Sequence, residues 1–146
     1  MYVDITKNAV LFYKALEDIW CAERTFDGSP NNAVWNCCQA AEKLLKGFLQ
    51  CCGVNHDSTH DLSIILELVE REHILQESTT ISIFNLARYD QRLRYKNLKS
   101  DPTREDAQAT IEDVKLVLAE FAEHPKCASY IREAREVHAK MLRGIS

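Results

Sequence analysis

Apolar side chains recur every three or four residues along most of this chain. That period is typical of amphipathic α-helices, which bury one face against their neighbours. The clearest stripes are Ile5, Ala9, Phe12, Leu16 and Trp20; Ala33, Cys37, Ala40, Leu44, Phe48 and Cys51; and Ala107, Ile111, Val114, Leu118 and Phe121. These stripes predict three long helices.

Capping and turn-forming residues indicate where the long helices start and stop. Ser29 followed by Pro30 is typical of a helix start, because serine can accept a hydrogen bond from the first turn and proline lacks an amide hydrogen. Gly53 suits the position just past a helix end. Thr103, three residues before Asp106, is typical of a cap on a later helix. The expected long helices cover residues 5–24, 30–52 and 103–124.

Weaker patterns predict shorter helices and a helical tail. An apolar stripe begins at Leu62, residues 81–89 have a less regular stripe, and residues 128–143 form a charged amphipathic segment. We therefore predict an all-α fold: an antiparallel up-and-down four-helix bundle with a short extra helix and a C-terminal helical extension. Residues 1–124 are expected to form the bundle, and residues 125–146 a helix appended to the same domain.

Composition excludes several other classes of protein. The chain has 146 residues with only 4 glycines and 3 prolines, which is few for a fold of many short strands. No apolar run approaches the roughly 18–20 residues that cross a bilayer. The first residues carry an acid where a secretory signal carries bases. We expect a cytoplasmic protein that has no membrane partner.

Charge is distributed unevenly along the chain. The formal net charge is −4, yet the stretch from Arg88 to Arg104 holds six bases and two acids. That stretch is therefore +4 and the remainder is −8. A basic stretch in an acidic chain can face a phosphate or another anion. The alternative is a solvated loop that balances the acidic surface elsewhere.

Metal and cofactor chemistry has little support. The six cysteines include two adjacent pairs but no Cys-x-x-Cys, and neighbouring side chains on a helix diverge by about 100°. We expect reduced thiols that pack as small apolar groups. Glu70 and His73 form a single Glu-x-x-His, whereas di-metal bundles use that motif twice. Glycine-rich phosphate loops are absent from the sequence. We predict no metal and no cofactor.

Three stretches, in this order, resemble the HEPN family, the "higher eukaryotes and prokaryotes nucleotide-binding" domains. The first is Gln39-Ala-Ala-Glu-Lys-Leu-Leu-Lys46, on the second predicted helix. The second is Thr59-His-Asp-Leu62, and the third is Tyr89-Asp-Gln-Arg-Leu-Arg-Tyr95. The chain departs from the family pattern at Lys96, where relatives have a proline. The resemblance covers roughly residues 5–123.

The resemblance implies a helical bundle that is commonly a homodimer. HEPN domains are associated with nucleotide binding, with RNA cleavage, or with pairing to a small nucleotidyltransferase in toxin–antitoxin operons. The partners that it implies are a second copy of the chain, RNA or a nucleotide, and a nucleotidyltransferase.

The basic stretch provides the candidate nucleotide- or anion-binding residues. If residues 81–95 are helical, Arg88, Arg92 and Tyr95 share one face. Arginine forks match phosphate oxygens, and a tyrosine ring can stack on a base. The complete candidate set is Gln39, Lys43, Lys46, Arg88, Tyr89, Arg92, Arg94 and Tyr95, with the first three on a facing wall. The alternative is that the arginines pair with acids across the bundle and Tyr95 packs at its end.

A catalytic site has weaker support. Active HEPN ribonucleases use an arginine and a histidine a few residues apart, in metal-independent chemistry. Only Arg132 and His138 have that spacing, with five residues between them, and Glu133 follows the arginine. The pair lies beyond the stretch that resembles the family.

We therefore interpret the protein first as a binding or partner module. The first alternative is a metal-independent RNA endonuclease that uses Arg132 and His138 or an atypical basic cleft. The second alternative is a structural bundle that assembles only with itself. The Thr59, His60 and Asp61 stretch is interpreted as a structural turn that caps the third helix.

Overall fold

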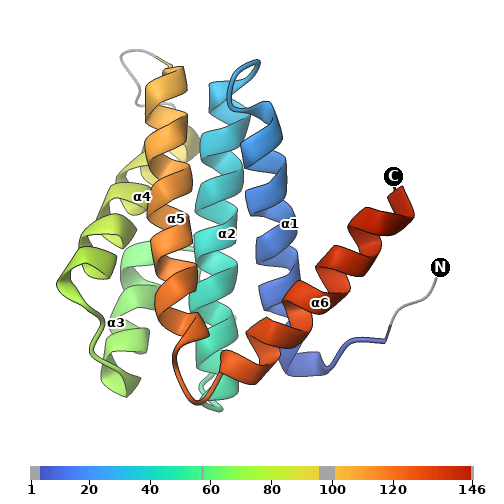
Figure 1. Cartoon of the computed structure of the whole chain (residues 1–146). Coiled ribbons are helices and arrows are strands. Elements are labelled where there is room, and N and C mark those ends of the chain that lie inside the picture. Colours follow the sequence, from blue (N-terminus) through green and yellow to red (C-terminus); the bar gives the residue numbers. More distant parts are fainter. Residues whose placement is uncertain (1–3, 57, 96–100, 146) are drawn as a thin grey trace.

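The computed structural model describes residues 4–56, 58–95 and 101–145. Within these ranges the ordered elements are all helical, and none is long and apolar enough to cross a membrane. They are the 3-10 helix η1 (Lys7–Ala9) and the α-helices α1 (Val10–Thr25), α2 (Pro30–Cys51), α3 (Leu62–Glu72), α4 (Glu77–Tyr95), α5 (Arg104–Ala122) and α6 (Ala128–Ile145) (Figure 1). The all-α helical bundle is confirmed.

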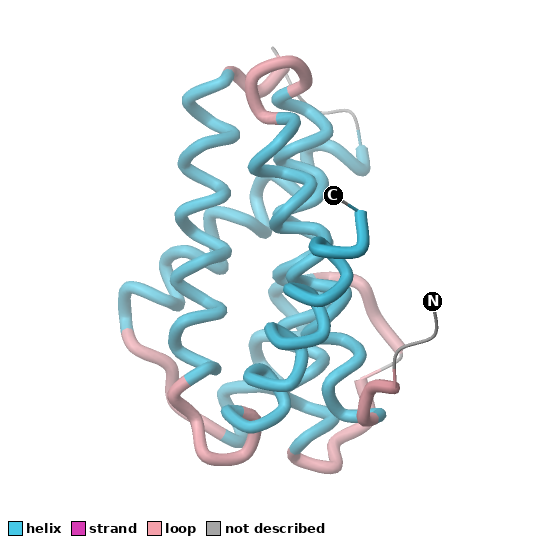
Figure 2. Tube along the Cα trace, turned by 45° about the vertical axis from the view of Figure 1, so that its right-hand side comes forward, coloured by secondary structure: helices cyan, strands magenta, loops and turns pink. Residues whose placement is uncertain are grey.

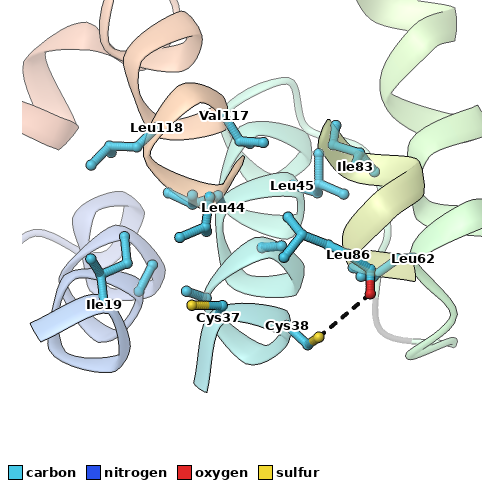
Figure 3. Close-up of a cluster of buried hydrophobic side chains, with 14 of the residues drawn as sticks. Ile19, Cys37, Cys38, Leu44, Leu45, Leu62, Ile83, Leu86, Val117 and Leu118 are labelled. Atoms are coloured by element: carbon cyan, nitrogen blue, oxygen red, sulfur yellow. Dashed lines mark hydrogen bonds between the residues drawn. The ribbon is translucent and has the colours of Figure 1, made fainter. Parts of the chain in front are cut away.

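Helix α2 is the centre of the bundle. It packs against α1, α3, α4 and α5, and more than half of its residues are buried. Figure 3 shows Leu44 of α2 between Ile19 of α1 and Leu86 of α4. A helix that is apolar on several sides needs neighbours on all of them, and this explains why the bundle forms around it.

Helices α1 and α2 approach each other closely at Gly47. A Cβ atom at this position would lie 2.8 Å from the Cε1 atom of Phe12, a fully buried side chain of α1. The absence of a side chain at Gly47 therefore lets the Phe12 ring lie directly on the backbone of α2.

The predicted ends of the long helices agree well with the structure. Thr103 Oγ1 accepts from the Asp106 amide at 3.1 Å, and Asp106 Oδ2 accepts from the Thr103 amide at 2.9 Å, which makes a complete capping box on α5. Gly53 has φ +74° just past α2. Ser29 precedes α2, but its side chain makes no capping hydrogen bond.

Helix α4 is much longer than the short helix predicted over residues 81–89. It starts at Glu77 and continues through the basic residues to Tyr95. The pattern hides this length because α4 buries polar residues, Thr79, Ser82 and Asp90, beside its apolar ones. The part of the basic stretch from Arg88 to Tyr95 therefore forms the last turns of a long helix.

Helix α6 lies obliquely across α1, on the side of the molecule away from α4 (Figure 1). Figure 2 shows the same helix passing in front of the bundle. Its inner face buries Ile131, Ala134 and Val137, and Cys127 just before it is also buried.

The six cysteines are free thiols, in line with their predicted packing role. Cys37 and Cys38 are buried on α2, and the Cys38 thiol lies 3.5 Å from the Leu86 carbonyl oxygen (Figure 3). Burial raises the pKa of Cys37 to about 12. A thiol with such a pKa stays protonated and unreactive at neutral pH.

Candidate functional site

A cavity of about 330 Å³ lies between the C-terminal half of α4 and the loop that enters α3. The residues that α4 contributes follow helical spacing and therefore share one face of that helix. The cavity is lined by Ser58, Thr59, His60, Asp61, Leu62, Ala87, Asp90, Gln91 and Arg94.

The loop side of the cavity is held by side-chain hydrogen bonds. Thr59 Oγ1 accepts from the Asp61 amide at 3.0 Å, and Asp61 Oδ1 accepts from the Ser63 amide at 2.9 Å. Asp61 is thus the N-cap of α3. The His60 ring does not cap the helix: its Nδ1 lies 2.8 Å from Glu42 Oε2 on α2.

Glu42 is the buried acid at the back of this region. Its residue is only 8% exposed, and three side chains converge on its carboxylate. Lys46 Nζ lies 3.2 Å from Oε2, His60 Nδ1 2.8 Å from Oε2, and Arg94 Nη2 3.7 Å from Oε1. Glu42 and Lys46 lie four residues apart on α2, and their ion pair is buried. A buried carboxylate needs such partners because an unpaired charge is costly away from water.

Arg94 connects α4 to two acids and an aromatic ring. Its Nε lies 3.0 Å from Asp90 Oδ2, and its guanidinium carbon lies 5.1 Å from the centre of the Trp35 ring. Burial raises the pKa of Asp90, and the hydrogen bond from Arg94 opposes that rise. Arg94 is therefore largely engaged within the protein.

Gln39 follows Trp35 and precedes Glu42 on the α2 face that Arg94 crosses. The Gln39 Nε2 atom is buried and has no hydrogen-bond partner in the part of the chain that the structure describes. Buried polar atoms are nearly always paired in proteins. This face of α2 therefore has one buried hydrogen-bond donor that the described chain does not satisfy.

Arg88 and Arg92 are exposed on a face of α4 that is rotated by about 100° from the cavity. Arg88 Nη2 donates to the neutral Asn85 Oδ1 at 2.7 Å. Tyr89, between them, is partly buried, and burial together with Asp106 raises the pKa of its hydroxyl. The backbone of Tyr95 ends α4, while its side chain, Lys96 and Lys99 lie outside what the structure describes.

The predicted facing wall is divided between two sides of α2. Lys46 and Gln39 face the region of Glu42 and Arg94. Lys43 pairs with Asp18 of α1 and is not among the residues that line the cavity. The structure therefore brings Thr59, His60, Asp61 and Arg94 together around the cavity, with Lys46 behind it.

Arg132 and His138 lie on α6, on another part of the molecule. Arg132 is exposed. The His138 ring packs edge-on against Tyr13 of α1, with the ring centres 6.1 Å apart, beside a small cavity of about 100 Å³. Helices α4 and α6 make no contact in the described ranges. A single copy of the chain does not bring this pair to the larger cavity.

Sequence reasoning missed the roles of Trp35 and Asp90. Asp90 was counted only as an acid within a basic stretch. Its spacing from Ile83, Leu86 and Arg94 was the available signal, because three- and four-residue steps put it on the buried side of one helix. Trp35 lies next to a buried stripe, and its position gave no sign of a stacked guanidinium. No histidine, cysteine or carboxylate cluster within the described ranges is arranged to hold a metal ion.

Comparison with known proteins gives one match. The model of the HEPN domain family matches residues 9–124. The match runs from η1 to just past the end of α5, so that it includes the cavity and excludes Arg132 and His138. No curated protein and no solved structure matches the chain.

Proposed function

The chain belongs to the HEPN domain family, and from that premise we propose that it binds single-stranded RNA or nucleotides at the C-terminal half of α4. Family membership indicates a nucleotide- or RNA-related function in broad terms. The observation that carries the finer proposal is a cavity of about 330 Å³ beside an exposed arginine face on the same helix.

The arginines of α4 differ in whether their charges are paired within the protein. Arg88 and Arg92 are exposed, and Arg88 donates a hydrogen bond to a neutral amide, that of Asn85. Guanidinium groups in this situation can make paired hydrogen bonds to phosphate oxygens. Arg94 is already held by Asp90 and Glu42. We therefore assign the phosphate contacts to Arg88 and Arg92.

The test is a titration of the protein with labelled single-stranded RNA at two salt concentrations, in chelator, resolved on native and denaturing gels. Binding should weaken as salt rises. The double variant Arg88→Ala/Arg92→Ala should bind more weakly, and its slope of log affinity against log salt should be shallower by about 1.4, because each lost phosphate contact contributes about 0.7.

The matched control is Arg132→Ala/Arg135→Ala, which removes the same charge from exposed positions of α6. An equal loss of affinity in both double variants would contradict the proposed site. If the wild type cuts RNA in the presence of chelator and His138→Ala does not, the protein is an endonuclease and not simply a binding module.

We also propose that the protein forms a homodimer. Ile81 and Phe84 of α4 and Leu116 of α5 are large apolar side chains that are 52%, 51% and 40% exposed. They lie on two helices that pack against each other. Large apolar side chains that are exposed on neighbouring helices favour contact with a protein partner.

A further inference from the structure

We propose that the cavity between α3 and α4 receives a nucleobase through its N–H donors, with guanine as the best fit, while phosphate stays outside on Arg88 and Arg92. This inference rests on the proposed function and assigns a base preference to the same site. It divides the site into a base-reading cavity and a phosphate-binding face.

The charge of the cavity argues against phosphate inside it. Two carboxylates line it, those of Asp61 and Asp90, and the carboxylate of Glu42 lies behind the loop histidine. The fixed cations nearby are Arg94, which lines the cavity, and Lys46, which pairs with Glu42. Three acids and two bases leave a net negative charge when His60 is neutral. A negatively charged phosphate group would therefore be repelled, whereas a neutral group with N–H donors would not.

The arrangement of acceptors favours guanine among the bases. The ring N–H and the exocyclic amino group of guanine lie side by side, and a carboxylate can accept from both. Sequence-specific binding of single-stranded RNA reads these Watson–Crick edges. Asp90 is only 5% exposed, and Arg94 fixes its orientation through a 3.0 Å hydrogen bond. Such a fixed carboxylate is well suited to reading two adjacent donors.

The shape and the lining also suit a base. About 330 Å³ lies within the range of roughly 300–1,000 Å³ that small-ligand sites occupy. Leu62 and Ala87 supply apolar surface for a ring. The His60 side chain is 69% exposed while its Nδ1 is held by Glu42, so its ring is positioned for stacking.

A second observation indicates that polar groups here lack partners. The buried Gln39 amide has no partner in the described ranges, on the α2 face that Arg94 crosses. Gln39 does not itself line the cavity, but its unpaired amide indicates that polar groups behind Arg94 are not all satisfied by the described chain.

The experiment uses 12-residue oligouridine RNAs that carry one central guanosine, inosine, adenosine or uridine. The guanosine RNA should bind roughly tenfold more tightly than the adenosine and uridine RNAs. The inosine RNA should lose much of that advantage, because inosine lacks the exocyclic amino group. Asp90→Asn, which replaces one acceptor by a donor, should abolish the guanosine preference.

Two further variants keep the test decisive. Ala87→Leu fills the cavity without changing any charge, and it should remove the same preference even if Asp90→Asn does not fold. Asp113→Asn is the matched control. Burial raises the pKa of Asp113, as it does that of Asp90, but Asp113 lies on α5, away from the cavity, and accepts a hydrogen bond from Ser82 at 2.9 Å. This control should keep the guanosine preference.

The outcomes separate this inference from the proposed function. Equal affinity of the wild type for all four RNAs, with normal salt dependence, would overturn base reading and leave RNA binding intact. A guanosine preference that persists in Ala87→Leu would also overturn it. Absence of binding to any of the RNAs would instead contradict the proposed function itself.

Discussion

Glu42 is a buried carboxylate on which a lysine, a histidine and an arginine converge from three segments of the chain. Its position couples the core to the candidate site, because Arg94 and His60 also line the cavity. Such a cluster contributes to the stability of the fold only while every charge is paired, since a single unpaired buried charge lowers the free energy of unfolding by more than an ion pair raises it.

Glu42→Gln should therefore lower the free energy of unfolding by about 3 kcal/mol, because it leaves the buried Lys46 ammonium without its acid. Urea denaturation measures the change. Glu67→Gln, at an exposed position of α3, is the control and should have little effect. The double variant Glu42→Gln/Lys46→Met should regain much of the loss, and a double variant as unstable as the single one would contradict this explanation.

His124 gives a pH-dependent prediction at the other end of the bundle. Burial lowers the pKa of His124 from 6.5, the neighbouring His73 and Lys126 lower it further, and the carboxylate of Glu120 opposes the shift. Protonation is thus easier in the unfolded chain than in the folded one. This contribution to stability is complete above pH 6.5, and it is lost as the pH falls through the lower folded pKa.

The corresponding measurement is the urea midpoint between pH 7.5 and pH 5. His124→Asn should reduce the fall in midpoint at acidic pH, because asparagine does not titrate. The local contact is kept, since the asparagine oxygen can still accept from the Lys126 amide, which lies 3.1 Å from His124 Nδ1. His138→Asn is the control for loss of an imidazole on α6. An unchanged pH profile in His124→Asn would exclude this histidine as the cause.

At the scale of single residues, local pairs were predictable and long-range partners were not. The Glu42–Lys46 pair follows from four-residue spacing on one helix. The contact of Lys43 with Asp18 depends on how α1 packs against α2, which no local pattern specifies. Trp35 of α2 was missed for the same reason, because its partner, Arg94, comes from α4. Asp90 is different: Arg94 lies four residues later on the same helix, so the pair was available from local spacing.

Among the elements, α1 and α2 pack closely because Gly47 leaves room for the Phe12 ring. Gly47→Ala should destabilise the protein by about 1–3 kcal/mol through overpacking, although alanine has the better helix propensity. Gly28→Ala is the matched control, because a Cβ atom there meets nothing within 4 Å. Thermal or urea unfolding of the two variants checks the prediction, and equal stability would contradict it.

The capping box of α5 gives a second prediction at this scale. Thr103→Ala removes the side-chain acceptor of the Asp106 amide. The loss should be about 1 kcal/mol, which is typical of an N-cap. Thr103→Ser keeps the hydroxyl and should stay near the wild-type stability. If serine were as destabilising as alanine, the cap would not be the cause.

Helix boundaries were predicted correctly where local capping residues mark them, and wrongly where a helix buries polar residues. Pro30, Gly53 and the Thr103 box are local signals, and they place the ends of α2 and the start of α5 correctly. Helix α4 was predicted too short, because its buried Thr79, Ser82 and Asp90 interrupt the apolar period. Those polar residues are tolerated because other side chains pair with them, such as Asp113 with Ser82 and Arg94 with Asp90.

For the whole molecule, the proposed homodimer makes a direct prediction. Phe84→Glu introduces a charge on the exposed apolar surface of α4 and should shift the protein from dimer to monomer. Light scattering after size-exclusion chromatography measures the mass. Ile64→Glu is the control, because Ile64 is similarly exposed, at 48%, but lies on α3. A wild-type protein that is already monomeric at high concentration would contradict the proposal.

The central place of α2 also has a consequence for the motions of the molecule. Because four other helices cover α2, its amide hydrogens can reach deuterated water only when the bundle opens as a whole. Among the described elements, helix α6 contacts only η1, α1 and α5, and we therefore expect it to detach by itself. Deuterium uptake along the chain should therefore reveal two separate processes: slow exchange in α2 that reports global unfolding, and faster exchange in α6 that reports a local opening.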